Sequence, residues 1–535
     1  MKPSNMQHIK NGAAALVAGL AMAFAGASCS DEPDAGQTAG HKWDIAGNEI
    51  VNIKPERQKL LRNPMSGWVI YAGLGDGLSD TFWEDYDNFP STVGPVKVSD
   101  YGTTLFIRGA WSDFNPEEGK YVWNEGQVNS KPAQRFKILV EGAKARGLKL
   151  AFSFVCDSQD KHYNFTPDYV REAGAKGFET VTGSVTVWSP FADDPVFQQK
   201  YEQFIKDLAA KYDDPDVKMF ISGTGLGKWG ETHTMRFSTG DNTPRRAIAE
   251  WVSDVYTRYF KRVPLLINYH RTLLSTSAFT DNPSKESEDI IDMFVEKGYS
   301  LRHDAFGMKQ YYKDWERGMA KKYLYRRPLV MEGGWVQSSH GNSIKGDGYA
   351  DWGEVRWGEF YEGKQACVNM MDFRYSKTAG ETYLWFNQAY EAINEFIADG
   401  GYRLYPDKIS IPVSASANDN VTVTHRWSNL GWGYCPTNIP QWNQKYKVAF
   451  ALLDKTTEKP VAVYVDEVPC LDTWLKGKPS TYTATFNLGA VSAGEYLWAI
   501  GLVDTTKDNE IGLQISAKDN ITSDGWLKLH TVSIH

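Results

Sequence analysis

The segment PAQRFKILVEGAKARGLKLAFSFV, residues 132–155, decides the fold class. Its apolar residues fall first at helical spacing, over 132–146, and then form a short, mostly apolar run over 149–155. A helix followed directly by a buried strand is the repeating unit of a parallel sheet. Similar units recur from Asn63 to Asn387. The predicted strands are 67–71, 103–109, 149–155, 217–223, 263–268, 300–307, 328–331 and 382–386.

Eight strands alternating with helices predict an α/β fold, a (β/α)₈ TIM barrel over residues 51–400. An open, doubly wound sheet is the structural alternative. Such a sheet would carry a glycine-rich phosphate turn after its first strand, but Gly73, Gly75 and Gly77 lack the required third position and the helix that should follow. We interpret this glycine-rich stretch as a loop.

The sequence pattern changes after residue 400. Over residues 401–535, apolar and polar residues alternate in short runs that are separated by turn residues, which predicts a C-terminal antiparallel β-sandwich domain. This domain either supports the barrel or binds glycan by itself. The predicted strands are 409–414, 421–427, 446–453, 461–465, 481–488, 496–503, 513–515 and 526–534.

The N-terminus predicts export. Lys2 and Lys10 precede a small, apolar stretch over 12–27 that ends at Ser28-Cys29, so residues 1–28 are interpreted as a signal peptide. The sequence before Cys29 resembles a bacterial lipobox, which implies lipidation of Cys29 and a membrane contact through the lipid anchor only. Residues 29–50 begin with an acidic, then small and polar composition typical of a flexible tether. The acidic start resembles the surface-export signal of Bacteroidetes lipoproteins, so we expect an outer membrane, cell-surface location.

Composition limits the partners. The formal charge of −8 and the absence of a basic run argue against nucleic acid. Nineteen Trp and 28 Tyr exceed ordinary core needs, and aromatic faces can stack on sugar rings. The cysteine spacings match no zinc or redox motif, so no metal and no cofactor are predicted; Cys435 and Cys470 either pair or stay free. The oligomeric state stays open.

Two glutamates follow predicted strands at positions that suit catalysis. Glu231 lies after strand four, in the run Trp229-Gly230-Glu231, and Glu332 follows strand seven directly. Active sites of these barrels form where strands end in loops, and strands four and seven face each other. Hydrolysis of a glycosidic bond needs two carboxyl groups, so the pair predicts a glycoside hydrolase. Two unrelated surface acids are the alternative.

The segments 105–111 and 115–121 resemble the second-strand region of clan A, β-galactosidase-like retaining glycoside hydrolases. The approach from Asp194 through Asp216 to Glu231 is similar to that of the clan's acid/base, and Glu332 matches its nucleophile position. The whole chain also looks like a poorly characterised group of bacterial barrel-plus-sandwich proteins. The resemblance implies retention through a double displacement. Where the clan carries Asn before the acid/base, this chain has Gly230.

Other polar and aromatic residues near predicted strand ends are candidates for substrate contact, with structural pairing as the alternative reading. Arg108 and Arg302 leave open an anionic sugar, since a guanidinium matches a carboxylate or sulfate. The runner-up function is a non-catalytic surface lipoprotein that binds glycan. A lyase or esterase is a third reading, although no Gly-x-Ser-x-Gly elbow is present. The substrate-binding candidates are Arg108, Trp111, Asp157, Trp229, His233, Asn268, His270, Arg302, Asp304, Trp335 and Trp385.

Overall fold

The computed structural model describes residues 41–75, 80–336, 347–374 and 380–535. The predicted signal peptide and Cys29 lie outside these residues. From Lys42 to His535 the chain forms one compact unit. None of its described helices is both long enough and apolar enough to cross a membrane.

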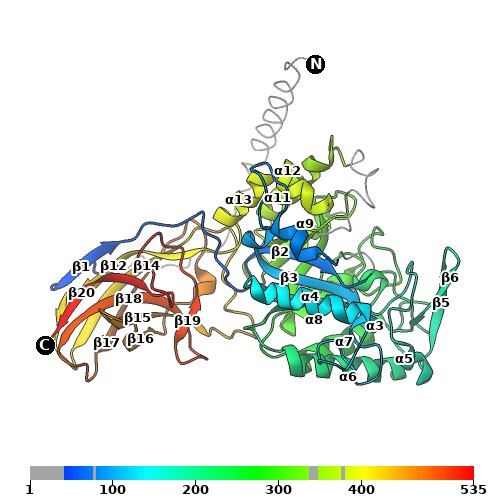
Figure 1. Cartoon of the computed structure of the whole chain (residues 1–535), viewed down its shortest axis with the longest axis horizontal. Coiled ribbons are helices and arrows are strands. Elements are labelled where there is room, and N and C mark those ends of the chain that lie inside the picture. The colour runs from blue at the N-terminus through cyan, green and yellow to red at the C-terminus, as the bar shows by residue number, and fades with distance from the viewer. Residues whose placement is uncertain (1–40, 76–79, 337–346, 375–379) are drawn as a thin grey trace, which may run out of the picture. The chain divides into compact units, whose positions relative to one another are not determined.

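Within the described residues, eight parallel strands close into a barrel, as predicted (Figure 1). Neighbouring strands pair in sequence order around the ring, and the last pairs with the first. Side chains therefore fill the barrel interior, and the loops that follow the strands lie together at one end of the barrel. The strands are β2 (Gly67–Gly73), β3 (Gly102–Ala110), β4 (Lys149–Val155), β7 (Lys218–Ser222), β8 (Leu265–Asn268), β9 (Ser300–Phe306), β10 (Leu329–Gly333) and β11 (Met370–Asp372).

Helices follow the strands, and several start at capping residues. The Ser130 side chain accepts a hydrogen bond from the Ala133 amide, 3.2 Å away, and Asp194 caps the next long helix just before Pro195. These side chains satisfy amide groups that have no partner within the helix. The longer helices are α4 (Lys131–Ala145), α6 (Pro195–Tyr212), α7 (Arg245–Tyr259), α8 (Lys285–Glu296), α9 (Asp314–Lys322), α11 (Trp352–Gln365), α12 (Gly380–Gln388) and α13 (Tyr390–Asp399).

The predicted eighth strand is wrong. Residues 382–386 lie inside helix α12, and strand eight is the three-residue β11, which pairs with β10 and β2. A short apolar run is compatible with either a buried strand or a buried helix. Trp385 is therefore on a helix, fully buried against Trp68, with ring centroids 4.9 Å apart. This placement removes Trp385 from the barrel mouth.

The C-terminal domain contains two sheets, as the sequence predicts. One has the order β1-β12-β14-β17, and the other β13-β20-β18-β15-β16, with β19 beside β18. Phe450 of β15 stacks on Phe486 of β17 at 5.8 Å, so the two sheets share one core. The strands are β12 (Leu404–Pro412), β13 (Ser414–Ala415), β14 (Asn420–Asn429), β15 (Tyr446–Asp454), β16 (Pro460–Asp466), β17 (Ser480–Asn487), β18 (Gly494–Asp504), β19 (Glu510–Leu513) and β20 (Leu527–Ile534).

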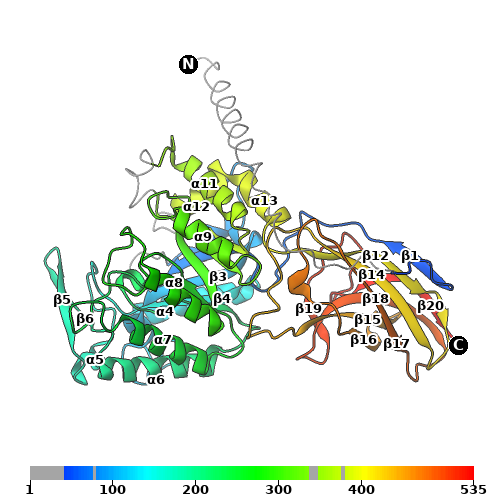
Figure 2. The same cartoon turned by 180° about the vertical axis from the view of Figure 1, so that it is seen from behind.

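The N-terminal boundary needs correction. Residues 48–50, assigned to the tether, and 51–52, assigned to the barrel, together form strand β1 (Asn48–Asn52). This strand pairs antiparallel with β12, so Ile50 lies opposite Ser410. Figures 1 and 2 show β1 beside β12 and β14. The sandwich is thus completed by chain that precedes the barrel. Cys435 and Cys470 are both free thiols.

Candidate active site

A pocket of about 820 Å³ opens where the barrel strands end. It combines aromatic walls with charged groups of both signs, which is the usual composition of a site for a polar ligand. Its lining residues are Tyr71, Gly73, Gly75, Arg108, Gly109, Ala110, Val155, Asp160, Lys161, Tyr163, Phe165, Trp229, Glu231, Phe279, Asp304, Ala305, Tyr311, Gly334, Trp335 and Arg374.

A tight turn after β7 carries Glu231 into this pocket. Gly227 and Gly230 have positive φ angles of 74° and 72°, and Trp229 between them has φ 59°. A Cβ atom at Gly230 would lie 2.8 Å from the carbonyl oxygen of Phe154. Any side chain at this position, including the Asn of the clan A pattern, would therefore be strained and would clash with the backbone. Glycine at this position is a requirement of the local backbone.

The Glu231 carboxylate is almost completely buried and pairs with two basic residues. Arg108 Nη2 donates to its Oε1 at 2.9 Å, and His233 Nε2 lies 3.5 Å from its Oε2. Burial by itself would raise the pKa of Glu231, but Arg108 and His233 hold that pKa well below its ordinary value. The His270 ring lies 2.6 Å from the Glu231 carbonyl oxygen and so supports the turn. Glu231 is ionised in this arrangement.

Glu332 lies at the end of β10 and is fully buried. Its two oxygens contact three arginines: Arg108 at 3.3 Å, and Arg302 and Arg374 in closer ion pairs. Arg108 therefore bridges Glu231 and Glu332. Such charge pairing keeps a buried carboxylate ionised.

Asp304 is the third carboxyl group of the site. Met331 pairs with His303 and Gly333 with Phe306, so a β-bulge in β9 sets two residues, Asp304 and Ala305, opposite Glu332. Ala305 has φ 53°, which is strained for a residue with a Cβ. The bulge directs Asp304 into the pocket, where burial and the nearby Glu231 charge raise its pKa to about 7.

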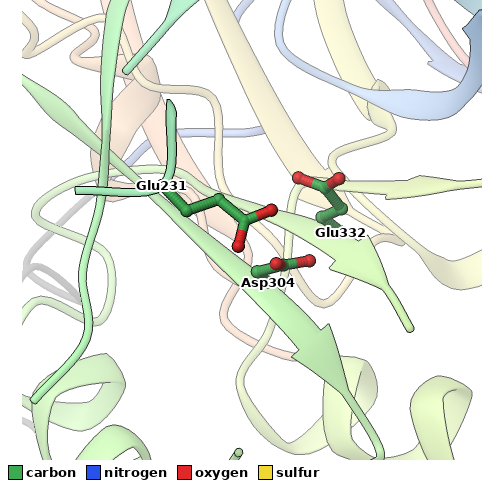
Figure 3. Close-up of side chains that lie close together, drawn as sticks. All are labelled: Glu231, Asp304 and Glu332. Atoms are coloured by element: carbon green, nitrogen blue, oxygen red, sulfur yellow. The ribbon is translucent and has the colours of Figure 1, made fainter. Parts of the chain in front are cut away.

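Figure 3 shows the three carboxyl groups converging, and one oxygen of each lies within 4.8 Å of the others. Carboxylates at this spacing can hold a divalent cation. Here, however, Arg302 and Arg374 already neutralise Glu332, and Arg108 contacts both glutamates. A bound metal ion would have to sit among three guanidinium groups, so we assign no metal to this cluster.

The structure brings most of the predicted residues to the pocket or to the layer beneath it. Arg108, Trp229 and Trp335 line the pocket beside Glu231 and Asp304. The layer beneath contains Glu332, His233, His270, Arg302 and Asn268. Arg302 also stacks on the Phe106 ring at 4.7 Å.

Two further predicted contacts do not reach the pocket. Trp111 lies on the short helix α3 (Trp111–Phe114), fully buried against Tyr201 at 5.2 Å, because an indole ring there fills the space between the barrel and α6. Asp157 accepts hydrogen bonds from Gln159 and Ser189, and so fixes the loop after β4. Both residues are structural, as is Trp385.

Sequence reasoning missed Arg374 and Tyr71. Arg374 was overlooked because the predicted strand eight starts at 382, twelve residues after the observed start of β11 at Met370. The short segment 368–373, in which Val368, Met370, Met371 and Phe373 are apolar, is the signal that could have located it. Its guanidinium lies 4.5 Å from the Trp335 ring and 4.8 Å from the Tyr71 ring. Asp160 was missed as well, although its carboxylate accepts a hydrogen bond from the Trp229 indole at 2.9 Å.

No protein-family model and no curated protein matches the chain. Among solved structures, an exo-β-1,4-mannosidase from Opitutaceae bacterium strain TAV5 aligns with TM-score 0.35 and 11% identity over 64% of this chain and 62% of its own, less than two thirds. Endo-glycoceramidase II from Rhodococcus sp. aligns with TM-score 0.36 and 10% identity, over 79% and 98%. A D-psicose 3-epimerase from Clostridium cellulolyticum H10 gives TM-score 0.30 and 12% identity, over 62% and 96%.

Proposed function

We propose that this protein hydrolyses glycosidic bonds with retention of configuration, Glu332 acting as nucleophile and Glu231 as acid/base. The observation that carries the proposal is the spacing of these two groups, whose nearest oxygens lie within 4.8 Å beside the pocket. Retaining enzymes hold their carboxyl groups about 5–5.5 Å apart, whereas inverting enzymes leave about 6.5–9.5 Å for a water molecule. The spacing here favours direct attack.

The surrounding residues fit a sugar substrate. Trp229 and Trp335 line the pocket, and indole rings can stack on the apolar face of a pyranose ring. Asp160 accepts the Trp229 N–H, which holds that ring in one orientation. Arg108 contacts both glutamates and would stabilise charge as it moves between them during the reaction.

The alternative is a surface lipoprotein that binds glycan without cleaving it. The complete burial of Glu332 beneath three arginines favours this reading, because a carboxylate so fully neutralised can serve as a structural counter-ion. In both readings we propose that Cys29 is lipidated and that the protein faces the exterior of the outer membrane.

A panel digestion separates the two functions. The purified protein is incubated with plant, algal and host glycans, products are followed by mass, and the anomeric configuration of the first product is read by NMR. Hydrolysis that releases the same anomer as the substrate supports the proposal. Tight binding of a glycan without any product supports the binding alternative, and release of the opposite anomer contradicts the role of Glu332.

A further inference from the structure

The acid/base role of Glu231 leaves one chemical requirement unmet. A general acid must carry a proton before the bond breaks. Arg108 and His233 both contact the Glu231 carboxylate and favour its ionised form. The proton for the leaving oxygen must therefore come from a neighbouring group that is itself protonated and close to Glu231.

We propose that Asp304 is that group, and that it shares one proton with Glu231 and supplies it to the leaving oxygen. This inference rests on the proposed hydrolase function. Asp304 and Glu231 both line the pocket, and one oxygen of each lies within 4.8 Å of the other. Two carboxyl groups this close disfavour simultaneous ionisation, so one of them keeps the proton.

The asymmetry of the contacts decides which carboxyl group holds the proton. Glu231 faces Arg108 at 2.9 Å, while the nearest guanidinium to Asp304 is that of Arg374, at 3.9 Å. Asp304 therefore lacks the close cation that stabilises Glu231, and its pKa of about 7 agrees with a protonated state near neutrality. The charged and titratable groups that face the pair are Tyr71, Arg108, His233, His270, Arg302, His303, Tyr311, Glu332 and Arg374.

The proton movement balances as follows. Glu332 attacks the anomeric carbon, a C–O bond to Glu332 forms, and the bond to the leaving oxygen breaks. That oxygen takes a proton from Glu231, which receives one from Asp304. Glu332 has then lost its charge as an ester, and Asp304 has gained one. In the second step water attacks the anomeric carbon, an O–C bond to that carbon forms, and its bond to the Glu332 oxygen breaks. The proton that the water loses returns through Glu231 to Asp304, and Glu332 leaves as a carboxylate.

Arg374 couples the loss of charge on Glu332 to the gain of charge on Asp304. Its Nη1 forms an ion pair with Glu332 Oε1 and lies 3.9 Å from Asp304 Oδ1. When Glu332 becomes a neutral ester, this guanidinium is released to stabilise the Asp304 carboxylate. The number of negative charges facing the three arginines therefore stays constant through the reaction. Asp304 becomes more acidic at the moment when its proton is needed.

The first test needs no substrate. Asp304→Asn keeps the side-chain shape and replaces the titratable carboxyl group by an amide that does not titrate. Because the folded-state pKa of Asp304 is raised from its ordinary 3.8 to about 7, the wild type loses stability as pH rises through this range. The Tm of Asp304→Asn minus that of the wild type should increase from pH 4 to 7 and then level off. If the amide disturbs folding, Asp304→Ser serves instead.

Asp160→Asn is the matched control, because it also removes one carboxylate from the pocket lining. Lys161 and Lys228 hold the pKa of Asp160 below its ordinary value, although burial opposes them. Its stabilisation is present above the unfolded pKa and is lost as pH falls, so this variant should show a Tm deficit near neutrality that disappears in acid. A flat difference for Asp304→Asn between pH 4 and 8 overturns the inference.

The second test uses any glycoside that the panel identifies. Asp304→Asn should lower kcat/KM at least about 100-fold for the natural leaving group and less than about 10-fold for a 4-nitrophenyl leaving group, which needs little protonation. The alkaline limb of the wild-type profile, near pH 7, should also disappear. If Asp304→Asn cleaves both substrates like the wild type, the inference fails while the hydrolase function stands. If the wild type cleaves nothing, the hydrolase function itself fails, whatever the stability profile shows.

Discussion

At the scale of single residues, the site is controlled by how three arginines are distributed among three carboxyl groups. Arg302 and Arg374 contact Glu332, and Arg108 joins Glu332 to Glu231. Buried charges are stable only when they are paired in this way. The functional roles can be separated by substitutions that keep side-chain shape and remove charge.

Glu332→Gln should lower kcat at least about 1,000-fold with glycan affinity nearly unchanged, because the amide cannot attack the anomeric carbon. Turnover and isothermal titration on the same glycan check this. The control is Glu316→Gln, which changes another buried carboxylate that pairs with an arginine, Arg271, away from the pocket lining. It should cost stability, about 3 kcal/mol, and leave kcat unchanged. Equal activity of Glu332→Gln and wild type would remove Glu332 from catalysis.

Glu231→Gln should lower the rate of the first step to an extent that depends on the leaving group of the substrate. Glycosides with a 2,4-dinitrophenyl leaving group need little protonation, so the first step should stay close to wild type and the covalent intermediate should accumulate. Azide should then restore turnover by attacking the intermediate from the side that Glu231 occupies, which releases a glycosyl azide detectable by mass. An equal loss of activity on all substrates, with no glycosyl azide formed, would argue against an acid/base role for Glu231.

At the scale of elements, strand β7 begins with an unusual residue. The Lys218 ammonium is buried at the base of the barrel, 2.9 Å from the centre of the Phe152 ring and 4.1 Å from that of Tyr212. Burial lowers the pKa of Lys218 well below its ordinary value. Apolar rings offset only part of the cost of removing an ammonium group from water.

Lys218→Met should therefore raise Tm at pH 7 by roughly 2 °C or more. Lys218 is protonated in the unfolded chain, whereas burial disfavours its charged form in the fold. The wild type is therefore destabilised below the pKa of the unfolded lysine, and its stability increases as pH rises toward about 10.4. The gain should shrink between pH 7 and 10 in thermal unfolding experiments. Lys149→Met provides the comparison. Lys149 is the first residue of the neighbouring strand β4, and its ammonium donates a hydrogen bond to the Pro215 carbonyl oxygen at 2.6 Å. Lys149→Met should therefore raise Tm by less than Lys218→Met does.

At the scale of the whole molecule, the barrel and the sandwich form one compact unit whose C-terminal sheet includes strand β1. The chain therefore enters the sandwich, builds the barrel and returns to complete the sandwich. Arg403 lies at the return point and donates to the carbonyl oxygens of Glu56 and Lys59. These contacts tie the two passages of the chain together.

Cys29→Ala should leave the exported protein in the soluble periplasmic fraction, because the thiol that would carry the lipid is absent. Fractionation of cells that express full-length wild type and variant checks this prediction. Cys470→Ala, which removes a free thiol of the sandwich, is the control and should fractionate like the wild type. Retention of Cys29→Ala in the membrane fraction would contradict lipid anchoring.

The sequence by itself determined the barrel class, seven of its eight strands and the positions of Glu231 and Glu332, because long buried runs and strand-end acids are local signals. Only the tertiary structure decided which residues meet. It identified β11 and hence Arg374, placed Trp111 and Trp385 in the core, and moved β1 into the sandwich. It also turned Asp304 toward Glu231 through a bulge. Pairing partners across a closed sheet depend on contacts between residues far apart in the chain, and local sequence patterns do not encode them.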